Sequence, residues 1–96
     1  MPIGKKFDST KIKWNLLPWA EVEEVARVMT YGAVKYAPDN WKIVPEAKER
    51  YFAAAIRHII AWQKGQKIDT ESKHHHLSHA ICCLLFIMWF DKRGRK

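Results

Sequence analysis

Residues 80–90 decide the fold, and they read AICCLLFIMWF. This is the longest apolar run of the chain, and it is well short of the roughly 20 residues that a bilayer-spanning helix needs. A helix that is apolar on all sides must be buried on all sides. Two further helices of a 96-residue chain can hardly cover it. We therefore expect a central helix that also packs against another subunit.

Two helices are expected before this run. The first begins near Pro18 and ends near Gly32, which can close a helix in the left-handed conformation. The second covers residues 45–65, and Glu46 and Glu49 favour its positive end. Their apolar stripes are Val22, Val25, Ala26 and Met29 in the first, and Phe52, Ala55, Ile56 and Ile59 in the second.

The third helix begins between Asp69 and Ser72 and contains the apolar run. Residues 1–16 show no periodicity and are expected to form an extended or loop segment. The sequence thus predicts an all-α fold: one domain over residues 1–96, a small bundle of three main helices that forms oligomers.

Composition narrows the classes of partner. The chain is 48% hydrophobic and 28% charged, which excludes a disordered tail. Its formal charge of +7 favours an anionic partner: nucleic acid, a nucleotide or phosphate, or a membrane surface. Cys82 and Cys83 are adjacent, too close for an ordinary disulfide, and are expected to be free buried thiols in a reducing compartment. The N-terminus lacks the apolar region of a signal peptide, so an intracellular protein is expected.

Two glutamates near the start of the first helix could hold a cation. Glu21 and Glu24 are three residues apart and share a helix face. Paired carboxylates suit a hard cation such as Mg²⁺ or Mn²⁺. The alternative is a solvated acidic first turn in which Glu23 pairs with Arg27.

A second polar cluster lies where the apolar helix begins. Its members are His58, His74, His75, His76, His79, Asp69 and Glu71. The spacing of His76 and His79 lets both imidazoles meet one ion, with an acid completing the shell. Zinc or another transition metal is possible here, although a thiolate site using Cys83 has only a weak signal without a Cys-x-x-Cys pair. The alternative is that these histidines cap the helix or face water.

A third group is basic and aromatic. Its members are Lys35, Tyr36, Asn40, Trp41, Arg50 and Arg57. Lys and Arg suit phosphate oxygens, an aromatic face can stack a base, and an amide can read the edge of a base. The alternative is that Trp41 anchors the core under a loop and Lys35 is ordinary surface. The sequence has no Gly-rich phosphate loop and no Gly-x-Ser-x-Gly turn, so metal-assisted hydrolysis is the enzyme class to expect.

Several blocks of the chain, read in order, resemble one known family. The most specific are residues 32–41, GAVKYAPDNW, and residues 69–79, DTESKHHHLSH. With Arg50-Tyr51 and residues 55–58 (AIRH), they are similar to the phage and prophage dATP/dGTP diphosphohydrolases over residues 4–90. The chain departs from the family at Lys73, where Gly is usual.

The resemblance implies a divalent-metal enzyme with Mg²⁺ or Mn²⁺. It would cleave a purine deoxynucleoside triphosphate into the monophosphate and pyrophosphate, in the cytoplasm of a bacterial host. The implied metal ligands are Glu24, Asp69, Glu71, His76 and His79, and the spacing of Glu21 from Glu24 adds Glu21 as a further candidate ligand. The implied catalytic residues are Glu24, His58, Glu71 and His79. The implied phosphate and base contacts are Lys35, Tyr36, Asn40, Trp41 and Arg57, and the basic group described above adds Arg50.

Two other functions stay open. A non-catalytic nucleotide-binding protein is favoured by the lack of a Glu-x-x-Asp motif after Glu21-x-x-Glu24, since all-α pyrophosphatases typically carry both. A nucleic-acid-binding protein is favoured by the basic residues 92–96, but no recognition helix or RNA module is visible. The expected partners are a purine nucleotide and other copies of the chain; we expect no membrane, and nucleic acid ranks last.

Overall fold

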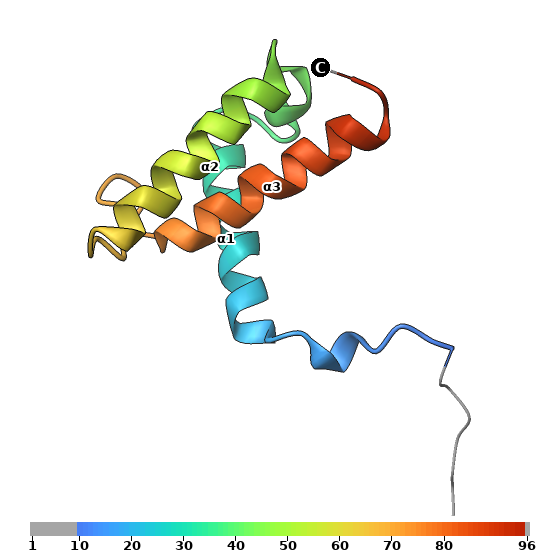
Figure 1. Cartoon of the computed structure of the whole chain (residues 1–96), viewed down its shortest axis with the longest axis horizontal. Helices are drawn as coiled ribbons and strands as arrows, with labels where there is room; N and C mark the ends of the chain where they lie inside the picture. The colour runs from blue at the N-terminus through green and yellow to red at the C-terminus, as the bar shows by residue number, and fades with distance from the viewer. Residues whose placement is uncertain (1–9, 96) are drawn as a thin grey trace, which may run out of the picture.

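The computed structural model describes residues 10–95, which form three helices joined by turns (Figure 1). The helices are α1 (Trp19–Lys35), α2 (Ala47–Gln63) and α3 (His76–Lys92), with short 3-10 turns η1 (Trp14–Leu16) and η2 (Asn40–Ile43). These residues contain no strand, only one isolated antiparallel bridge between Ile68 and His75. The all-α, three-helix prediction is confirmed. Residues 1–9 of the expected extended segment, and Lys96, lie outside the described residues.

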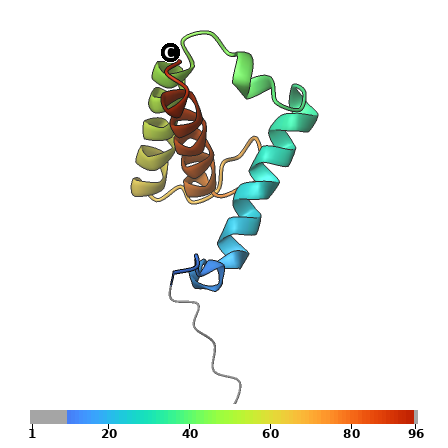
Figure 2. The ribbon, with the colours of Figure 1, turned by 90° about the vertical axis from the view of Figure 1, so that its right-hand side faces the viewer.

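Helices α2 and α3 run antiparallel side by side, and α1 packs against α3 (Figures 1 and 2). The contact between α1 and α3 is a small core of Val25, Val28 and Cys82, with Phe86 packed against it. The contact between α2 and α3 buries small side chains, including Ala55 and Ala80. Small residues let helix backbones approach each other, so the pair is tight while α1 touches it along one edge only.

The turn η2 is fixed to α3 by an aromatic stack. The Trp41 ring lies on Phe86 with centroids 4.4 Å apart and meets Trp89 edge to face at 5.1 Å. The Tyr51 hydroxyl donates to the Trp41 carbonyl at 3.4 Å. Trp41 therefore anchors η2 on α3, and this packing is compatible with either interpretation of the residue, because Trp41 stays partly exposed.

Two expected helix ends are wrong. α1 continues past Gly32 to Lys35, and the Gly32 carbonyl accepts the Tyr36 N–H at 2.9 Å. α3 begins at His76, after the expected range, because the backbone of residues 69–75 is bonded elsewhere. The Asp69 N–H donates to the His74 carbonyl, and the His76 N–H donates to the Lys67 carbonyl, both at 2.8 Å. These bonds close a turn, which a helix starting at Asp69 would have to break.

The expected apolar stripes are only partly correct. In α1, Val25 and Val28 are buried while Met29 is 37% exposed. In α2, Ala55 is buried, but Phe52 is 59% exposed and points away from the core. The face of α2 toward α3 combines the small Ala55 with the rings of Tyr51 and His58, which meet Phe86 and His79, and Phe52 lies outside this face.

The two cysteines are free and buried, as predicted. Burial raises the pKa of the Cys82 thiol to about 12 and that of Cys83 to about 11. Both are therefore protonated near neutral pH. None of the helices in the described part of the chain has the length and hydropathy needed to cross a bilayer.

Candidate active site

A cleft of about 1080 Å³ lies between α1 and the α2–α3 pair. Side chains from both sides, from η2 and from the turn before α3 line it. Those predicted from the sequence are Lys35, Tyr36, Asn40, Trp41, Arg50, Arg57, His58, Asp69, Glu71 and His79. Sites for small organic ligands commonly enclose about 300–1,000 Å³, so this cleft is large enough for a nucleotide.

Three predicted residues do not line this cleft. Glu21 is exposed and Glu24 is half-buried, and both lie in the first half of α1. Beside them, Glu23 and Arg27 form an exposed ion pair at 3.2 Å, as the alternative interpretation of this stretch expected. His76 is buried next to His58.

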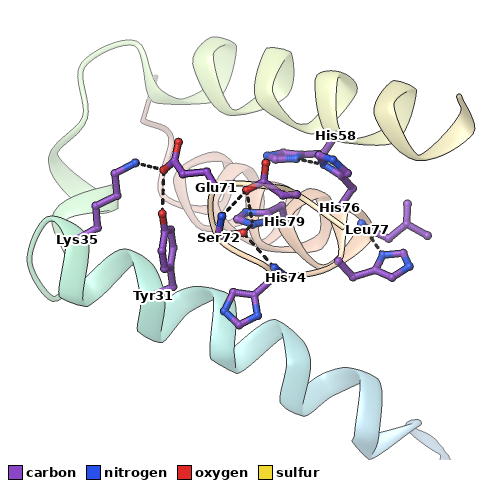
Figure 3. A network of polar contacts seen from close by, with 11 residues as sticks. Tyr31, Lys35, His58, Glu71, Ser72, His74, His76, Leu77 and His79 are labelled. Carbon is purple, nitrogen blue, oxygen red and sulfur yellow. Dashed lines mark hydrogen bonds and ion pairs between the residues drawn. The ribbon is translucent and has the colours of Figure 1, made fainter. Parts of the chain in front are cut away.

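On the α1 side of the cleft, one carboxylate receives two donors (Figure 3). The Tyr31 hydroxyl donates to Glu71 Oε2 at 2.8 Å, and the Lys35 ammonium forms an ion pair with the same oxygen. Tyr31 and Lys35 are four residues apart and so share a face of α1. We call these three residues the Glu71 cluster. The hydrogen bond from Lys35, followed by that from Tyr31, lowers the pKa of Glu71, while the Lys35 pKa is raised, chiefly by its hydrogen bond to Glu71.

Deeper in the cleft, Ser72 joins an acid to an imidazole (Figure 3). The Ser72 N–H donates to Asp69 Oδ2 at 3.0 Å, and the Ser72 hydroxyl lies 2.6 Å from His79 Nε2. Asp69 Oδ2 is 3.8 Å from the same nitrogen. Sequence reasoning did not single out Ser72. The available signal was its place three residues after Asp69, where an aspartate side chain commonly accepts a backbone N–H.

Two further histidines complete this group. The rings of His58 and His79 stack with centroids 4.5 Å apart and planes 11° apart. His58 Nδ1 lies 2.8 Å from His76 Nδ1, so one of the two must carry the proton. His76 Nε2 is buried without a hydrogen-bond partner among the described residues. We call His58, Asp69, Ser72, His76 and His79 the histidine cluster.

Within the histidine cluster, His58 and His79 favour the neutral imidazole. Burial, followed by the neighbouring His79 and His76, lowers the pKa of His58 to about 4. Burial also lowers the pKa of His79, although Asp69 acts in the opposite direction. For Asp69, partial burial opposes ionisation, but hydrogen bonding from Ser72 and the nearby His79 outweigh it and lower the pKa. Near neutral pH, the site therefore holds an ionised carboxylate beside an imidazole that is free to accept a proton.

The α2 wall of the cleft carries two arginines. Arg50 and Arg57 are seven residues apart and share a helix face, and both are exposed. Among residues 10–95, neither lies within ion-pair distance of a carboxylate. On the opposite wall, Lys35 Nζ lies 5.2 Å from the centroid of the Tyr36 ring. Cations thus face each other across the cleft, with an aromatic ring beside one of them.

The donors present do not enclose a metal ion. Within the described range, no three His, Cys, Asp or Glu side chains gather closely enough to hold one. Mg²⁺, however, is commonly held by one or two carboxylates together with substrate phosphates and waters. Asp69 and Glu71 on one cleft fit that arrangement, because an ion carried by a triphosphate would need only them from the protein.

The turn that carries both acids contains a strained residue. Lys73 has φ of 66°, in the left-handed region that favours glycine. This is the position where the family resemblance expected Gly. The Lys73 N–H donates to the Asp69 carbonyl at 2.8 Å, and this bond helps to close the turn.

Comparison with known proteins agrees with the resemblance. The chain matches the family model described as "dATP/dGTP diphosphohydrolase, N-terminal" over residues 2–96. A relative from Salmonella phage PMBT28, named dATP/dGTP diphosphohydrolase, is 38% identical over 86 residues. The match covers 90% of this chain and 29% of the relative, so the chain spans less than a third of that protein's length. No solved structure matches the chain. Because the family model covers nearly every residue, the chain belongs to the dATP/dGTP diphosphohydrolase N-terminal family.

Proposed function

We propose that the cleft binds a purine deoxynucleoside triphosphate, dATP or dGTP, and hydrolyses it to the monophosphate and pyrophosphate. One observation carries the proposal: Asp69, Glu71 and His79 line the same cleft as Lys35 and Arg57. The three groups come from separate parts of the chain, because Lys35 lies in α1, Arg57 in α2, and the acids and His79 in or just before α3. Acids, a neutral imidazole and cations around one cavity are the groups that phosphoryl chemistry requires. The name of the phage relative supports the choice of substrate.

The cations bind the triphosphate in this scheme. Arg50 and Arg57 are exposed and unpaired within residues 10–95, so their guanidinium groups can meet phosphate oxygens without first breaking an ion pair. Lys35 can exchange Glu71 for phosphate, because exposed ion pairs contribute little to stability. These groups offset the negative charge that develops on the leaving pyrophosphate. Tyr36 is exposed at the same wall and offers a face on which the purine can stack.

His79 serves as the general base. Its lowered pKa keeps the imidazole neutral near pH 7, the form that takes a proton. A water that loses its proton to His79 attacks the α-phosphorus. The bond from that phosphorus to the oxygen bridging to the β-phosphate breaks, and pyrophosphate leaves with the bond's electron pair. Ser72 and Asp69 hold the His79 ring in place through Nε2, so in this scheme Nε2 carries the ring's own hydrogen and Nδ1 takes the proton from the water.

The reaction is proposed to depend on Mg²⁺ or Mn²⁺ carried in with the triphosphate. Asp69 and Glu71 are the residues that would contact the ion, since both line the cleft and both have lowered pKa values. When bound, such an ion supplies Lewis-acid polarisation of the phosphoryl oxygens and lowers the pKa of bound water. Tyr31 and Lys35 both bind Oε2 of Glu71, so Glu71 would contact the ion through Oε1, or through Oε2 once the incoming phosphates attract Lys35.

The test is product analysis in ¹⁸O-labelled water. The protein is incubated with each of the four deoxynucleoside triphosphates and Mg²⁺ or Mn²⁺, and the products are separated by anion exchange. We expect equimolar monophosphate and pyrophosphate from dATP and dGTP, with the label in the monophosphate, and no turnover in EDTA. Release of orthophosphate alone, or label in the pyrophosphate, would contradict attack at the α-phosphorus.

A non-catalytic nucleotide-binding role is the second candidate. It is favoured by the absence, among residues 10–95, of a three-donor metal site. Isothermal titration calorimetry with dGTP would show binding in either case. Recovery of intact dGTP after long incubation with metal would assign the chain to this second role.

A further inference from the structure

Three cations gather around one indole ring at the end of α3. The guanidinium carbon of Arg93 lies 4.3 Å from the centroid of the Trp89 ring, and that of Arg95 lies 5.4 Å from it. The Lys42 ammonium lies 5.5 Å from the same centroid. An aromatic ring attracts cations within about 6 Å of its centroid, so all three contact this ring. We call Lys42, Trp89, Arg93 and Arg95 the Trp89 cluster.

A helix-capping turn holds Arg95 in this cluster. The Arg95 N–H donates to the Phe90 carbonyl at 2.9 Å, and the Gly94 N–H donates to the Asp91 carbonyl at 3.1 Å. These two bonds form a Schellman motif, and Gly94 has the left-handed φ of 65° that this motif favours. The chain therefore turns back at Gly94, and Arg95 lies beside the last turn of α3.

Lys42 reaches the cluster from another part of the chain. The Trp41 ring stacks on Phe86 and meets Trp89 edge to face, so η2 is fixed to α3. Lys42 directly follows Trp41, and its ammonium also lies 5.4 Å from the Trp41 ring centroid. Two segments that are far apart in the sequence thus bring like charges to one place.

Helix capping explains only part of this arrangement. The Arg93 guanidinium donates to the Trp89 carbonyl at 3.1 Å, as basic side chains at the end of a helix commonly do. Arg95 and Lys42 donate no such bond to α3 among the described residues, and like charges around one ring repel each other. Within residues 10–95, neither arginine lies within ion-pair distance of a carboxylate, and Asp91 is paired with a lysine of α2. An anion bound by these cations would relieve their repulsion.

The cluster is open to solvent and separate from the cleft. Arg93 and Arg95 are exposed, and no member of the cluster lines the cleft. Lys42 is paired with Asp39 at 3.2 Å, but an exposed ion pair contributes little to stability, so Lys42 can exchange this partner for a phosphate. Small ligands usually occupy concave sites, whereas a polyanion gains affinity on an open surface from every phosphate that is neutralised. The open position therefore favours a polymer over a free nucleotide.

We propose that the Trp89 cluster binds the phosphate backbone of a nucleic acid, independently of its base sequence. The arginine side chains can each donate to two phosphate oxygens, and Lys42 adds a compact charge. The net charge of +7 attracts a polyanion from a distance. From sequence alone, nucleic acid ranks last among the partners, because residues 92–96 belong to no recognition helix or RNA module. The structure adds that two of these residues are held against one ring and are joined there by Lys42.

The test is the binding of a labelled oligonucleotide of mixed sequence, single-stranded and as a duplex, followed by fluorescence anisotropy over a series of salt concentrations. The logarithm of the binding constant should fall with the logarithm of the salt concentration with a slope of about −2 to −3, as three neutralised phosphates give. The triple variant Lys42→Gln/Arg93→Gln/Arg95→Gln should bind about tenfold more weakly or worse, and its slope should be smaller by about one for each cation removed.

A matched triple variant controls for net charge. Lys11→Gln/Lys13→Gln/Lys64→Gln removes the same charge from exposed positions away from the end of α3 (Figure 1), and it should bind nearly as the wild type does. Equal losses in the two triple variants would overturn the proposal, because binding would then depend on overall charge. Absence of binding by the wild type at low salt would overturn it as well.

A measurement on the wild type covers the case in which the cluster variant fails to fold. The oligonucleotide should shift the indole N–H resonance of Trp89, assigned with Trp89→Phe, more than that of Trp62, which is 41% exposed on α2. An unshifted Trp89 resonance would contradict the proposal. Displacement of the oligonucleotide by an equal phosphate concentration of free dGTP would also contradict it, because the cluster would then be a site for free anions. Neither readout involves hydrolysis, so this proposal does not rest on the proposed function.

Discussion

The turn before α3 sends two carboxylates of the same segment into opposite surroundings. The Glu71 side chain is 64% exposed and paired with the Lys35 ammonium. The Asp69 side chain is 24% exposed and faces His79, whose side chain is only 15% exposed. One acid is thus held by a charge at the rim of the cleft, and the other by hydrogen bonds beside neutral rings.

The difference separates two kinds of chemistry. A charge at the rim is screened by water and can change partners at little cost, which suits phosphate capture. A neutral imidazole in a less hydrated place has a lowered pKa and can accept protons near neutral pH, which suits general-base catalysis. Under the proposed function, the Glu71 cluster would act on binding and the histidine cluster on the chemical step, and each prediction below tests that division.

The largest effect is expected from His79→Asn. If His79 takes the proton of the attacking water, kcat should fall by about 10²–10⁴-fold while KM changes little. Steady-state assays of monophosphate release from dGTP measure both constants. The matched control is His75→Asn: His75 caps α3 by accepting the Leu77 N–H at 3.0 Å, and Asn is also a good cap. Equal losses of kcat in the two variants would show that the histidine cluster is not the seat of the chemistry.

The sequence predicted only in part which residues form the Glu71 cluster, the histidine cluster and the rest of the cleft. The apolar run 80–90 and the seven-residue spacing of Arg50 and Arg57 are properties of single helices. Periodicity was therefore enough to place the run in a helix and both arginines on one helix face. The spacing of Glu21 and Glu24 is as regular as any of these, yet neither residue lines the cleft. Spacing shows that two residues share a helix face, but it does not show whether that face packs against the rest of the molecule.

The histidine cluster was harder to predict because it depends on a turn. The expected helix start at residues 69–72 would have put Asp69 and Glu71 on a helix, whereas the bonded turn gives each a separate direction. Ser72 was missed for the same reason. Its role comes from the 2.6 Å approach to His79, seven residues away, and no periodic pattern encodes that contact. The resemblance to a known family singled out residues 69–79, but it did not show which of these side chains contact one another.

A smaller effect is expected from Lys35→Met. Loss of one cation at the rim should raise KM for dGTP about tenfold and leave kcat nearly unchanged, because a charge-assisted hydrogen bond to phosphate is lost. Lys64→Met removes the same charge from an exposed position outside the cleft and should behave as wild type. A fall in kcat larger than the rise in KM would contradict the assignment of the Glu71 cluster to binding.

The pH dependence of stability tests the histidine cluster without substrate. The pKa of His58 is about 4 in the folded chain and 6.5 ordinarily, so between these values the unfolded chain binds more protons. The free energy of unfolding should therefore fall as the pH drops from 6.5 toward 4, by about 1–2 kcal/mol given the partial exposure of the ring. Urea unfolding across this range measures it. His58→Gln should flatten the dependence, and an unchanged slope would mean that His58 is not kept neutral by its neighbours.

The smallest effect is expected at the residue between the two clusters. Lys73 adopts φ of 66°, which costs a residue with a Cβ about 1–2 kcal/mol, while Gly pays instead in the entropy of the unfolded chain. Lys73→Gly should therefore raise the free energy of unfolding by about 0.5–1 kcal/mol, and Lys73→Ala, which keeps the Cβ, should not. Urea unfolding at neutral pH measures both variants. If the turn serves only to hold the two acids apart, Lys73→Gly should keep kcat and KM as they are. A stabilised variant with reduced kcat would instead show that the strained form of the turn assists the chemical step, and the two clusters would then have to be treated as one unit.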